Sequence, residues 1–243
     1  MHLENSRILI TGTRSGLGKY LSEMFPNSVH LNRENKNTVL QQLQSIDYVI
    51  HCAFNTSREI EDYYQFLDDN IFLTKFLSEL SPEKFIYISS VDVYSSEKTY
   101  YNMFKLFAES IVRKKCENHL ILRCSALIGK NMRKNNFLRI VDDAVPRLSL
   151  TSNSTYNFVS HSDVYSVICG SITDDVKGTY DMVSAKNITI ADLSSMFNKQ
   201  SEFGGFYYET PTVDNQELIR VFDFMNKTSK EVVEDFIREK NEL

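Results

Sequence analysis

The stretch that decides the fold is "ILITGTRSGLGKYL", residues 8–21. Its first residues are aliphatic or β-branched, as in a buried strand, and its last residues have helical spacing. Between them Gly12, Gly16 and Gly18 follow the order T-G-x-x-x-G-x-G. Glycine at such positions permits a tight turn and lets backbone N–H groups and a helix N-terminus approach a pyrophosphate. We therefore predict a dinucleotide-binding turn here. A plain strand–turn–helix, with glycines that serve only the turn, is the alternative.

The following sequence alternates short apolar runs with helical periodicity, a pattern typical of β-α-β units and a parallel sheet. We expect strands at residues 7–11, 28–32, 47–53, 84–90 and 119–125, and helices at 17–25, 38–45, 61–80 and 102–114. The run "KFIYISS" is almost continuously apolar, as expected of a strand that is covered on both faces. The predicted fold class is α/β, a Rossmann-type doubly wound parallel sheet.

The pattern loosens after about residue 129. Helical spacing is visible at 135–145 and 189–199, where Thr189 is the expected N-cap. Further strand or mixed segments are expected at 156–172, 178–184 and 204–210, before two terminal helices. We predict a dinucleotide-binding domain over residues 1–130. Residues 131–243 are expected to complete the sheet and to form a small substrate-binding cap.

Composition excludes several classes of protein. The chain has 243 residues, a net charge of −5 and no long run of Lys or Arg, which argues against nucleic-acid binding. Cys52, Cys116, Cys124 and Cys169 show no CxxC spacing, which indicates reduced thiols in the cytoplasm rather than a disulfide framework or a metal site. No apolar stretch approaches the roughly 20 residues of a membrane span, and the N-terminus lacks the apolar core of a signal peptide.

The choice of cofactor is predicted from the residues after the second expected strand. An NAD site usually has Asp or Glu about 20 residues beyond the first glycines. Here "HLNRENK" offers Arg33, with Glu34 one position late, and Arg14 in the glycine-rich turn is a second cation. Because Arg binds phosphate through two parallel hydrogen bonds, these residues favour NADP, with NAD possible. Ordinary surface arginines are the alternative.

A Tyr–Lys pair one helical turn apart occurs twice, as Tyr94 with Lys98 and as Tyr101 with Lys105. Residues at i and i+4 share a helix face, which suits acid–base chemistry but also arises by chance. Lys98 is expected to precede the helix that Thr99 caps, so Tyr94 and Lys98 need not share a face. Context has to decide which pair carries chemistry.

That context is a set of motifs in order along the chain: "TGTRSGLG", "DYVIHCA", "DDNIFLTKFL", "KFIYISSVDVYS", "YNMFK", "LILRCSALIG", "NFVSHSDVYSVI" and "GTYDMVS". Together they resemble the short-chain dehydrogenase/reductase superfamily, in its extended, nucleotide-sugar epimerase/dehydratase-like branch. One departure is the glycine spacing, which is that of the non-extended members, since extended members usually show G-x-x-G-x-x-G.

The resemblance implies roles for individual residues. Ser90 matches the catalytic serine, Tyr101 the catalytic tyrosine and Lys105 its lysine, whereas Tyr94 matches a turn position. Asn70 resembles an asparagine that supports the lysine through water; an ordinary amide on the helix surface is the alternative. The expected cofactor-binding residues are Gly12, Arg14, Ser15, Gly16, Leu17, Gly18, Arg33, Cys52, Ala53, Phe54, Asn70, Tyr101 and Lys105.

The residues after Ser90 discriminate among reactions. Sugar 4,6-dehydratases of this branch place Thr-Asp-Glu where this chain has Ser90-Val91-Asp92, so the first acid is missing. The cysteine of epimerase–reductases of the GDP-fucose type is also missing. We therefore predict an NADPH-dependent reductase of a C4 keto group on a nucleotide-linked sugar. A 4-epimerase with retained NAD is the nearest alternative, and a non-enzymatic NADP-sensing protein is an alternative of another class.

Two further expectations concern ligands and partners. Arg133, Lys134, Arg147 and Arg220 are candidates to meet the substrate diphosphate, although solvated surface cations are the alternative for each. The helices around residues 61–76 and 103–112 carry more large apolar residues than one sheet-facing stripe needs. Related proteins pair these helices as a four-helix bundle, so we expect a homodimer. Wide buried faces within one chain are the alternative.

Overall fold

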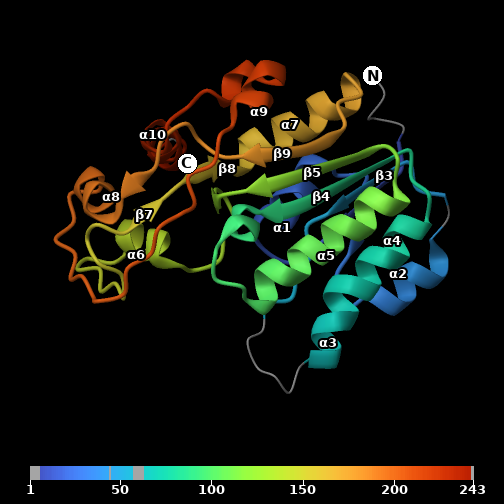
Figure 1. The fold of residues 1–243 in the computed structure, drawn as a ribbon, viewed down its shortest axis with the longest axis horizontal. Helices are drawn as coiled ribbons and strands as arrows, with labels where there is room; N and C mark the ends of the chain where they lie inside the picture. Colours follow the sequence, from blue (N-terminus) through green and yellow to red (C-terminus); the bar gives the residue numbers. More distant parts are fainter. Residues whose placement is uncertain (1–5, 44, 57–62, 242–243) are drawn as a thin grey trace.

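A six-stranded parallel sheet forms the centre of the molecule (Figure 1). The computed structural model describes residues 6–43, 45–56 and 63–241. The strands, in spatial order, are β2 (Val29–Leu31), β1 (Ile8–Thr11), β3 (Tyr48–His51), β4 (Lys84–Ser90), β5 (His119–Cys124) and β9 (Gly178–Met182). Every neighbouring pair is parallel. The predicted Rossmann-type sheet is confirmed.

The strand order reverses at β1, which pairs with β2 on one side and with β3 on the other. The chain therefore leaves β2 and crosses to the opposite side of β1 before the next strand. In open α/β sheets, ligands bind at such a reversal, beyond the carboxyl ends of the strands. The glycine-rich turn follows β1 at this point.

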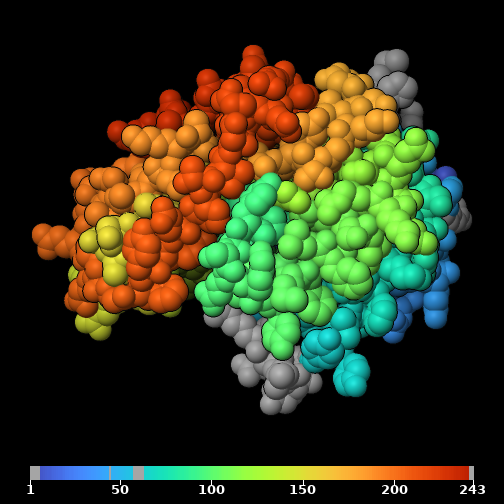
Figure 2. Space-filling view, in the orientation of Figure 1, coloured from blue at the N-terminus to red at the C-terminus, as the bar shows by residue number. Residues whose placement is uncertain are grey.

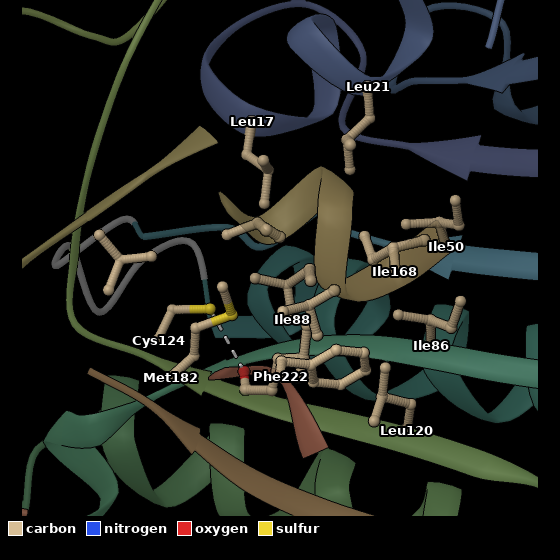
Figure 3. Packing of buried hydrophobic residues seen from close by; sticks show 14 of the residues in the cluster. Leu17, Leu21, Ile50, Ile86, Ile88, Leu120, Cys124, Ile168, Met182 and Phe222 are labelled. Carbon is tan, nitrogen blue, oxygen red and sulfur yellow. Dashed lines mark hydrogen bonds between the residues drawn. The ribbon is translucent and has the colours of Figure 1, made fainter. Parts of the chain in front are cut away.

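Helices cover both faces of the sheet (Figure 1). One face packs against α1 (Gly16–Met24), α7 (His161–Thr173) and α9 (Gln216–Val221), and the other against α2 (Lys36–Gln42), α4 (Leu73–Glu79) and α5 (Tyr100–Lys115). In the first core, Leu17 and Leu21 of α1 lie near Ile168 of α7 (Figure 3). In β1 the side chains alternate: Ile8 and Ile10 join this core, and Leu9 joins the other. All of β4 is buried, as expected of a strand covered on both faces.

The predicted helix at 61–80 is not regular. Glu61 and Asp62 lie outside the described residues, and the rest consists of α3 (Tyr63–Leu67), a π-helical turn η2 (Asp68–Phe72) and α4. The prediction of one continuous α-helix is wrong in this respect. The wider π turn carries three consecutive polar residues, Asp68, Asp69 and Asn70. Asp68 and Asp69 accept hydrogen bonds from cations that follow β2, and Asn70 accepts one from the backbone that follows β3.

The C-terminal half builds a third core. It contains α6 (Asn136–Asp142), α8 (Ile190–Met196) and α10 (Ser229–Asn241), with the short strands β6 (Ala126–Ile128), β7 (Thr155–Tyr156), β8 (Phe158–Ser160) and β10 (Ile188–Thr189). Residues 204–210, expected as a strand, form only isolated bridges at Phe206 and Glu209. Gly204 sits so close to the preceding layer that a Cβ there would lie 2.4 Å from the Ser149 carbonyl oxygen. Residues 204–210 therefore pack closely against the irregular segment around Ser149 without forming a regular β-ladder with it.

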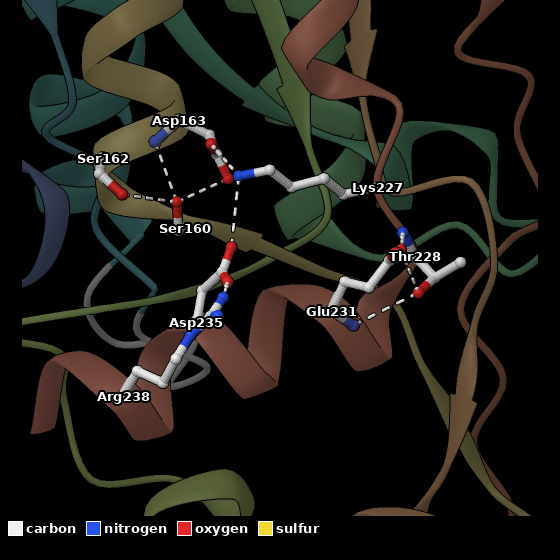
Figure 4. A network of polar contacts seen from close by, with 8 residues as sticks. All are labelled: Ser160, Ser162, Asp163, Lys227, Thr228, Glu231, Asp235 and Arg238. Carbon is white, nitrogen blue, oxygen red and sulfur yellow. Dashed lines mark hydrogen bonds and ion pairs between the residues drawn. The ribbon is translucent and has the colours of Figure 1, made fainter. Parts of the chain in front are cut away.

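A polar network fastens the last helix to the rest (Figure 4). The Nζ of Lys227 lies 3.3 Å from Oδ1 of Asp163 in α7 and 3.4 Å from Oδ2 of Asp235 in α10. Ser160 caps α7 by accepting a hydrogen bond from the Asp163 N–H. One cation therefore links the start of α7 to α10, although the two helices are distant in sequence.

Two predicted helix caps are confirmed. Thr99 caps α5 and forms a capping box with Asn102, and Thr189 caps α8 by accepting from the Asp192 N–H. Because Thr99 fixes where α5 begins, it also fixes the face on which Tyr101 and Lys105 lie. Within the described residues, no helix combines the length and the apolar character that a membrane span needs.

Candidate active site

A cleft of about 850 Å³ opens at the carboxyl ends of β1, β3 and β4. Its volume is in the usual range for sites that bind cofactors and small ligands. Of the predicted residues, those that line it are Gly12, Arg14, Ser15, Gly16, Leu17, Gly18, Arg33, Cys52, Ala53, Phe54, Ser90, Tyr101 and Lys105. Asn70 is not among the lining residues. The fold therefore gathers into one cleft segments that lie far apart in the sequence.

The glycine-rich turn has the geometry that a dinucleotide needs. Gly12 has φ +76°, and a Cβ there would lie 2.9 Å from the Ala53 backbone nitrogen. A Cβ on Gly18 would lie 2.4 Å from the Gly12 carbonyl oxygen, so neither position accepts a side chain. At Gly16, by contrast, a Cβ would meet nothing within 4 Å. This open side at the start of α1 fits the pyrophosphate of NAD or NADP.

Three lining cations that follow β1 and β2 are each paired with a carboxylate. Arg14 lies 2.8 Å from Glu34 and Arg33 lies 2.9 Å from Asp69. Lys36, which the sequence did not single out, lies 2.6 Å from Asp68. Asp69 lines the cleft, and its side chain is only 12% exposed. Asp68 and Asp69 were missed because each lies more than 30 positions from its partner and faces it only through the π turn.

Ser90, Tyr101 and Lys105 meet at the other end of the cleft. Lys105 is 4% exposed, and its Nζ donates a hydrogen bond of 2.7 Å to the Ile88 carbonyl oxygen. The same Nζ lies 4.1 Å from the centroid of the Phe54 ring. Burial lowers the pKa of Lys105 to about 8. Burial raises the pKa of Tyr101 to about 12, although its interaction with the Ser90 hydroxyl acts in the opposite direction. At neutral pH Tyr101 is therefore a protonated phenol beside a buried ammonium.

Tyr94 and Lys98 do not form an equivalent pair. Tyr94 ends a 3-10 turn, η3 (Val91–Tyr94), and its hydroxyl donates to Asp181 at 2.9 Å. Lys98 donates to the Val93 and Ser95 carbonyl oxygens. Neither residue lines the cleft. The expectation that they need not share a helix face is confirmed, because α5 begins only at Tyr100.

Asn70 is buried at 1% exposure and is not a surface amide. Its Oδ1 accepts from the Asn55 N–H at 2.7 Å, and its Nδ2 donates to the Asn55 carbonyl at 3.0 Å. The side chain therefore supports the loop after β3. Its predicted support of Lys105 through water stays a prediction, since Lys105 donates to Ile88.

A buried relay centred on His51 connects this loop with the glycine-rich turn. Thr74 donates its hydroxyl to the Asn70 carbonyl, so it accepts from Nε2 of His51, 2.9 Å away. Nδ1 of His51 then accepts from the Thr11 hydroxyl at 2.7 Å, and the Thr11 oxygen accepts from the Ala53 N–H at 2.9 Å. Burial lowers the pKa of His51 to about 3, so the ring is neutral. No sequence pattern indicated this role.

The C-terminal half contributes to the cleft as well. Its lining residues are Leu127, Met132, Arg133, Asn135 and His161. Of the four cations expected to meet a diphosphate, Arg133 is the one that lines the cleft; Lys134 and Arg147 lie near Asp143 and Glu202. Arg220 lies in α9, away from the lining.

Three further polar groups, on Asp92, Tyr208 and Ser125, lie near Ser90 or in the wall of the cleft. Burial raises the pKa of Asp92, although interactions with the Tyr208 and Ser90 hydroxyls act in the opposite direction. Tyr208 belongs to residues 204–210, so the C-terminal half reaches Asp92 next to Ser90. The Ser125 hydroxyl lies in the wall of the cleft, is buried, and has no hydrogen-bond partner among the residues that the structure describes. Buried polar groups normally have partners, so Ser125 is a candidate to contact a ligand.

Comparison with known proteins bears on the family. The sequence model of the NAD dependent epimerase/dehydratase family matches residues 8–151, which contain the glycine-rich turn, Ser90, Tyr101 and Lys105. The chain belongs to this family. The resemblance seen in the sequence is thereby confirmed, and the chain is an NAD(P)-dependent enzyme by family. No curated protein matches its sequence.

Solved structures share the fold over almost the whole chain. A dTDP-4-dehydrorhamnose reductase from Clostridium acetobutylicum has a TM-score of 0.79 and 16% identity, over 97% of this chain and 99% of that chain. The reductase of the same name from Bacillus anthracis, in complex with NADP, has a TM-score of 0.76 and 18% identity, over 96% and 99%. A UDP-N-acetylglucosamine 4-epimerase from Bacillus cereus has a TM-score of 0.72 and 21% identity, over 92% and 91%. At these identities the likeness shows the fold.

The His51 relay predicts a pH dependence of stability. The unfolded state binds a proton at a pKa near 6.5, whereas folded His51 stays neutral until about pH 3. The free energy of unfolding should therefore fall as the pH drops below about 6.5, by up to about 1.4 kcal/mol per pH unit from this residue. Urea unfolding at pH 7, 6 and 5 should show a shallower decline for His51→Gln than for the wild type. Parallel declines would contradict the relay.

Proposed function

We propose that the protein is an NADPH-dependent reductase of a C4 keto group on a nucleotide-linked sugar. The observation that carries the proposal is the meeting of Ser90, Tyr101 and Lys105 at the cleft, with burial holding Tyr101 in the protonated form. Ketone reduction needs a general acid that starts with its proton. Among the described lining residues the one carboxylate is Asp69, at the adenosine end, so the acid–base carboxyl pair of an elimination does not line this cleft.

The residues divide the work as follows. The turn around Gly12 and Gly16 holds the cofactor pyrophosphate, and Lys105 holds the hydroxyls of the nicotinamide ribose. When bound, the reduced nicotinamide supplies the hydride that is added to the carbonyl carbon. Tyr101 gives its phenolic proton to the carbonyl oxygen, and the Ser90 hydroxyl donates a hydrogen bond to that oxygen. The ammonium of Lys105 stabilises the tyrosinate that remains, since an opposite charge nearby favours the ionised form.

The compared structures support this proposal and its nearest alternative. Two of them are described as dTDP-4-dehydrorhamnose reductases, one in complex with NADP, and one as a UDP-N-acetylglucosamine 4-epimerase. A 4-epimerase that retains NAD would use the same three residues. A cofactor-sensing protein without activity is less well supported, because both Tyr101 and Lys105 are present and lie in the cleft.

The test is a reaction of NADPH with a nucleotide-linked 4-keto-6-deoxy sugar. We expect the wild type to consume NADPH in a one-to-one ratio with reduced product, measured by the absorbance of the nicotinamide. Tyr101→Phe should reduce turnover by about 10²-fold or more, the usual scale for a lost acid–base group. Tyr94→Phe, the control, should have a much smaller effect because Tyr94 bonds to Asp181 outside the cleft.

Equal losses in both variants would contradict the assignment of Tyr101. If the protein instead interconverts two fully hydroxylated nucleotide sugars without net use of cofactor, it is an epimerase. The reductase proposal would then be wrong.

For the cofactor we propose a preference for NADP over NAD. Arg14, Arg33 and Lys36 line the adenosine end and are the cations near which a 2′-phosphate would lie. The phosphate must compete with Asp69 for Arg33, which is exposed on its other side. Guanidinium–phosphate pairs are strong enough to favour this exchange.

Titration of both cofactors tests this preference. Arg33→Ala should weaken NADP binding by about tenfold or more and leave NAD binding nearly unchanged, since a charge-assisted hydrogen bond contributes about 1.5–3 kcal/mol. Asp69→Asn should strengthen NADP binding, because it frees Arg33 from its carboxylate. Equal affinities of the wild type for both cofactors, unchanged in Arg33→Ala, would contradict the proposal.

We also propose that residues 131–243 cover the substrate, and that the protein acts in the cytoplasm. Tyr208 reaches Asp92 beside Ser90, which supports the first proposal. All four cysteines are free, which suits a reducing compartment and supports the second.

A homodimer is proposed from the outer surface of α3, α4 and α5. Large apolar side chains are exposed there: Tyr63 42%, Tyr64 84%, Phe72 57%, Phe76 39%, Tyr100 56%, Met103 52% and Phe107 55%. Figure 2 shows α5 in green and the α3–α4 segment in cyan side by side on this surface. Their exposure argues against the alternative, in which these helices have wide faces buried within one chain. A patch of this kind typically marks a protein–protein interface.

Light scattering at micromolar concentration should give the mass of a dimer. Phe107→Glu should give a monomer, because it would bury a charge in the interface. Phe206→Glu is a matched control at 64% exposure on the C-terminal half and should leave the dimer intact. A monomeric wild type would contradict the proposal.

A further inference from the structure

The segment that follows β6, residues 129–133, lies against the glycine-rich turn. The Gly16 N–H donates to the Asn131 carbonyl oxygen at 2.6 Å. Nε of Arg133 donates to the Ser15 hydroxyl oxygen at 2.8 Å, across 118 positions of sequence. The C-terminal half of the chain thus contacts two successive residues of the turn.

This segment is held at its base. A Cβ on Gly129, which has φ +152°, would lie 2.7 Å from the ring of His161, so the backbone passes directly over α7. Nδ1 of His161 lies 3.0 Å from the Lys130 carbonyl oxygen. Nδ2 of Asn131 donates to Glu23 of α1 at 3.0 Å. These contacts fix the backbone that leads to Arg133 against α7 and α1.

Arg133 differs from the other cations that line the cleft in its ion pairing. The lining cations are Arg14, Arg33, Lys36, Lys105 and Arg133. The first three lie within 2.9 Å of a carboxylate, and Lys105 is buried at the catalytic end. Arg133 forms no ion pair with any carboxylate of the described residues. It is therefore the lining cation at the glycine-rich turn whose charge is not already balanced.

We propose that Arg133 binds the pyrophosphate of the cofactor, a proposal that rests on the dinucleotide-dependent function above. Ser15 is the N-cap of α1, and the open side of Gly16 lies next to it. The partial positive charge of a helix N-terminus and a guanidinium at the same place favour a diphosphate. Nε of Arg133 is engaged with Ser15, which leaves its two NH₂ groups to form paired hydrogen bonds with phosphate oxygens.

In this proposal, both halves of the chain contribute to binding the cofactor. The N-terminal half offers the positive end of α1, although the Gly16 N–H itself donates to Asn131, and the C-terminal half offers the charge of Arg133. A nucleotide sugar also carries a diphosphate, so the same chemistry could come from the substrate. The contact with Ser15 favours the cofactor, and the experiment separates the two.

Calorimetric titration with ADP-ribose and with adenosine tests the proposal. Arg133→Ala should weaken ADP-ribose binding by about 10- to 100-fold, the scale of lost charge-assisted hydrogen bonds to phosphate, and should leave adenosine binding unchanged. Arg133→Lys should retain part of the affinity, because it keeps the charge but loses the paired geometry. Lys134→Ala is the matched control: it removes the adjacent exposed cation, near Asp143, and should alter neither affinity.

A third titration uses UDP and dTDP with cofactor at saturation. Unchanged affinity for ADP-ribose in Arg133→Ala would overturn the proposal. A variant that loses affinity for UDP or dTDP, but not for ADP-ribose, would also overturn it by assigning Arg133 to the substrate. A wild type that binds no ADP-ribose would overturn the proposed function together with this inference. Thermal unfolding of each variant ensures that binding is compared between folded proteins.

Discussion

The structure depends on the contact between the glycine-rich turn and the end of β3. Gly12 meets the backbone of Ala53 at a distance that leaves no room for a Cβ, and Gly18 meets Gly12 in the same way. The hydroxyl of Thr11 accepts the Ala53 N–H beside this contact and donates to the neutral ring of His51. Steric contact and hydrogen bonding therefore fix the junction between the start of α1 and the end of β3. The walls of the cleft take their positions from it.

The two ends of the cleft handle charge in opposite ways. At the end of the cleft formed by Ser90 and Tyr101, Lys105 is buried among aromatic rings and a carbonyl oxygen, and burial lowers its pKa to about 8. At the other end Arg14 and Arg33 are exposed and are paired with Glu34 and Asp69. A charge that is desolvated acts strongly on a neighbouring proton, whereas a solvated pair is readily exchanged for another anion. The first arrangement suits chemistry and the second suits reversible binding.

The sequence predicted the elements that depend on local pattern. The strands of the sheet have apolar runs, Thr99 has the chemistry of a cap, and the glycines of the turn have backbone conformations that other residues rarely adopt. It could not predict features that depend on contacts between distant segments. Arg133 meets Ser15 across 118 positions, and the pairing of Arg33 with Asp69 needs both the sheet order and the π turn. Residues 204–210 look like a strand because of their aromatic content, but the backbone near them offers only isolated bridges.

The π turn η2 makes one ion pair depend on the local length of the chain. A π-helical turn, with i→i+5 hydrogen bonds, contains one residue more than an α-helical turn. Removing one residue from Asp68–Phe72 would restore α-helical spacing and shift the polar side chains that the wider turn carries. Asp69 would then leave Arg33. The extra residue of η2 is therefore what gives Arg33 its acidic neighbour.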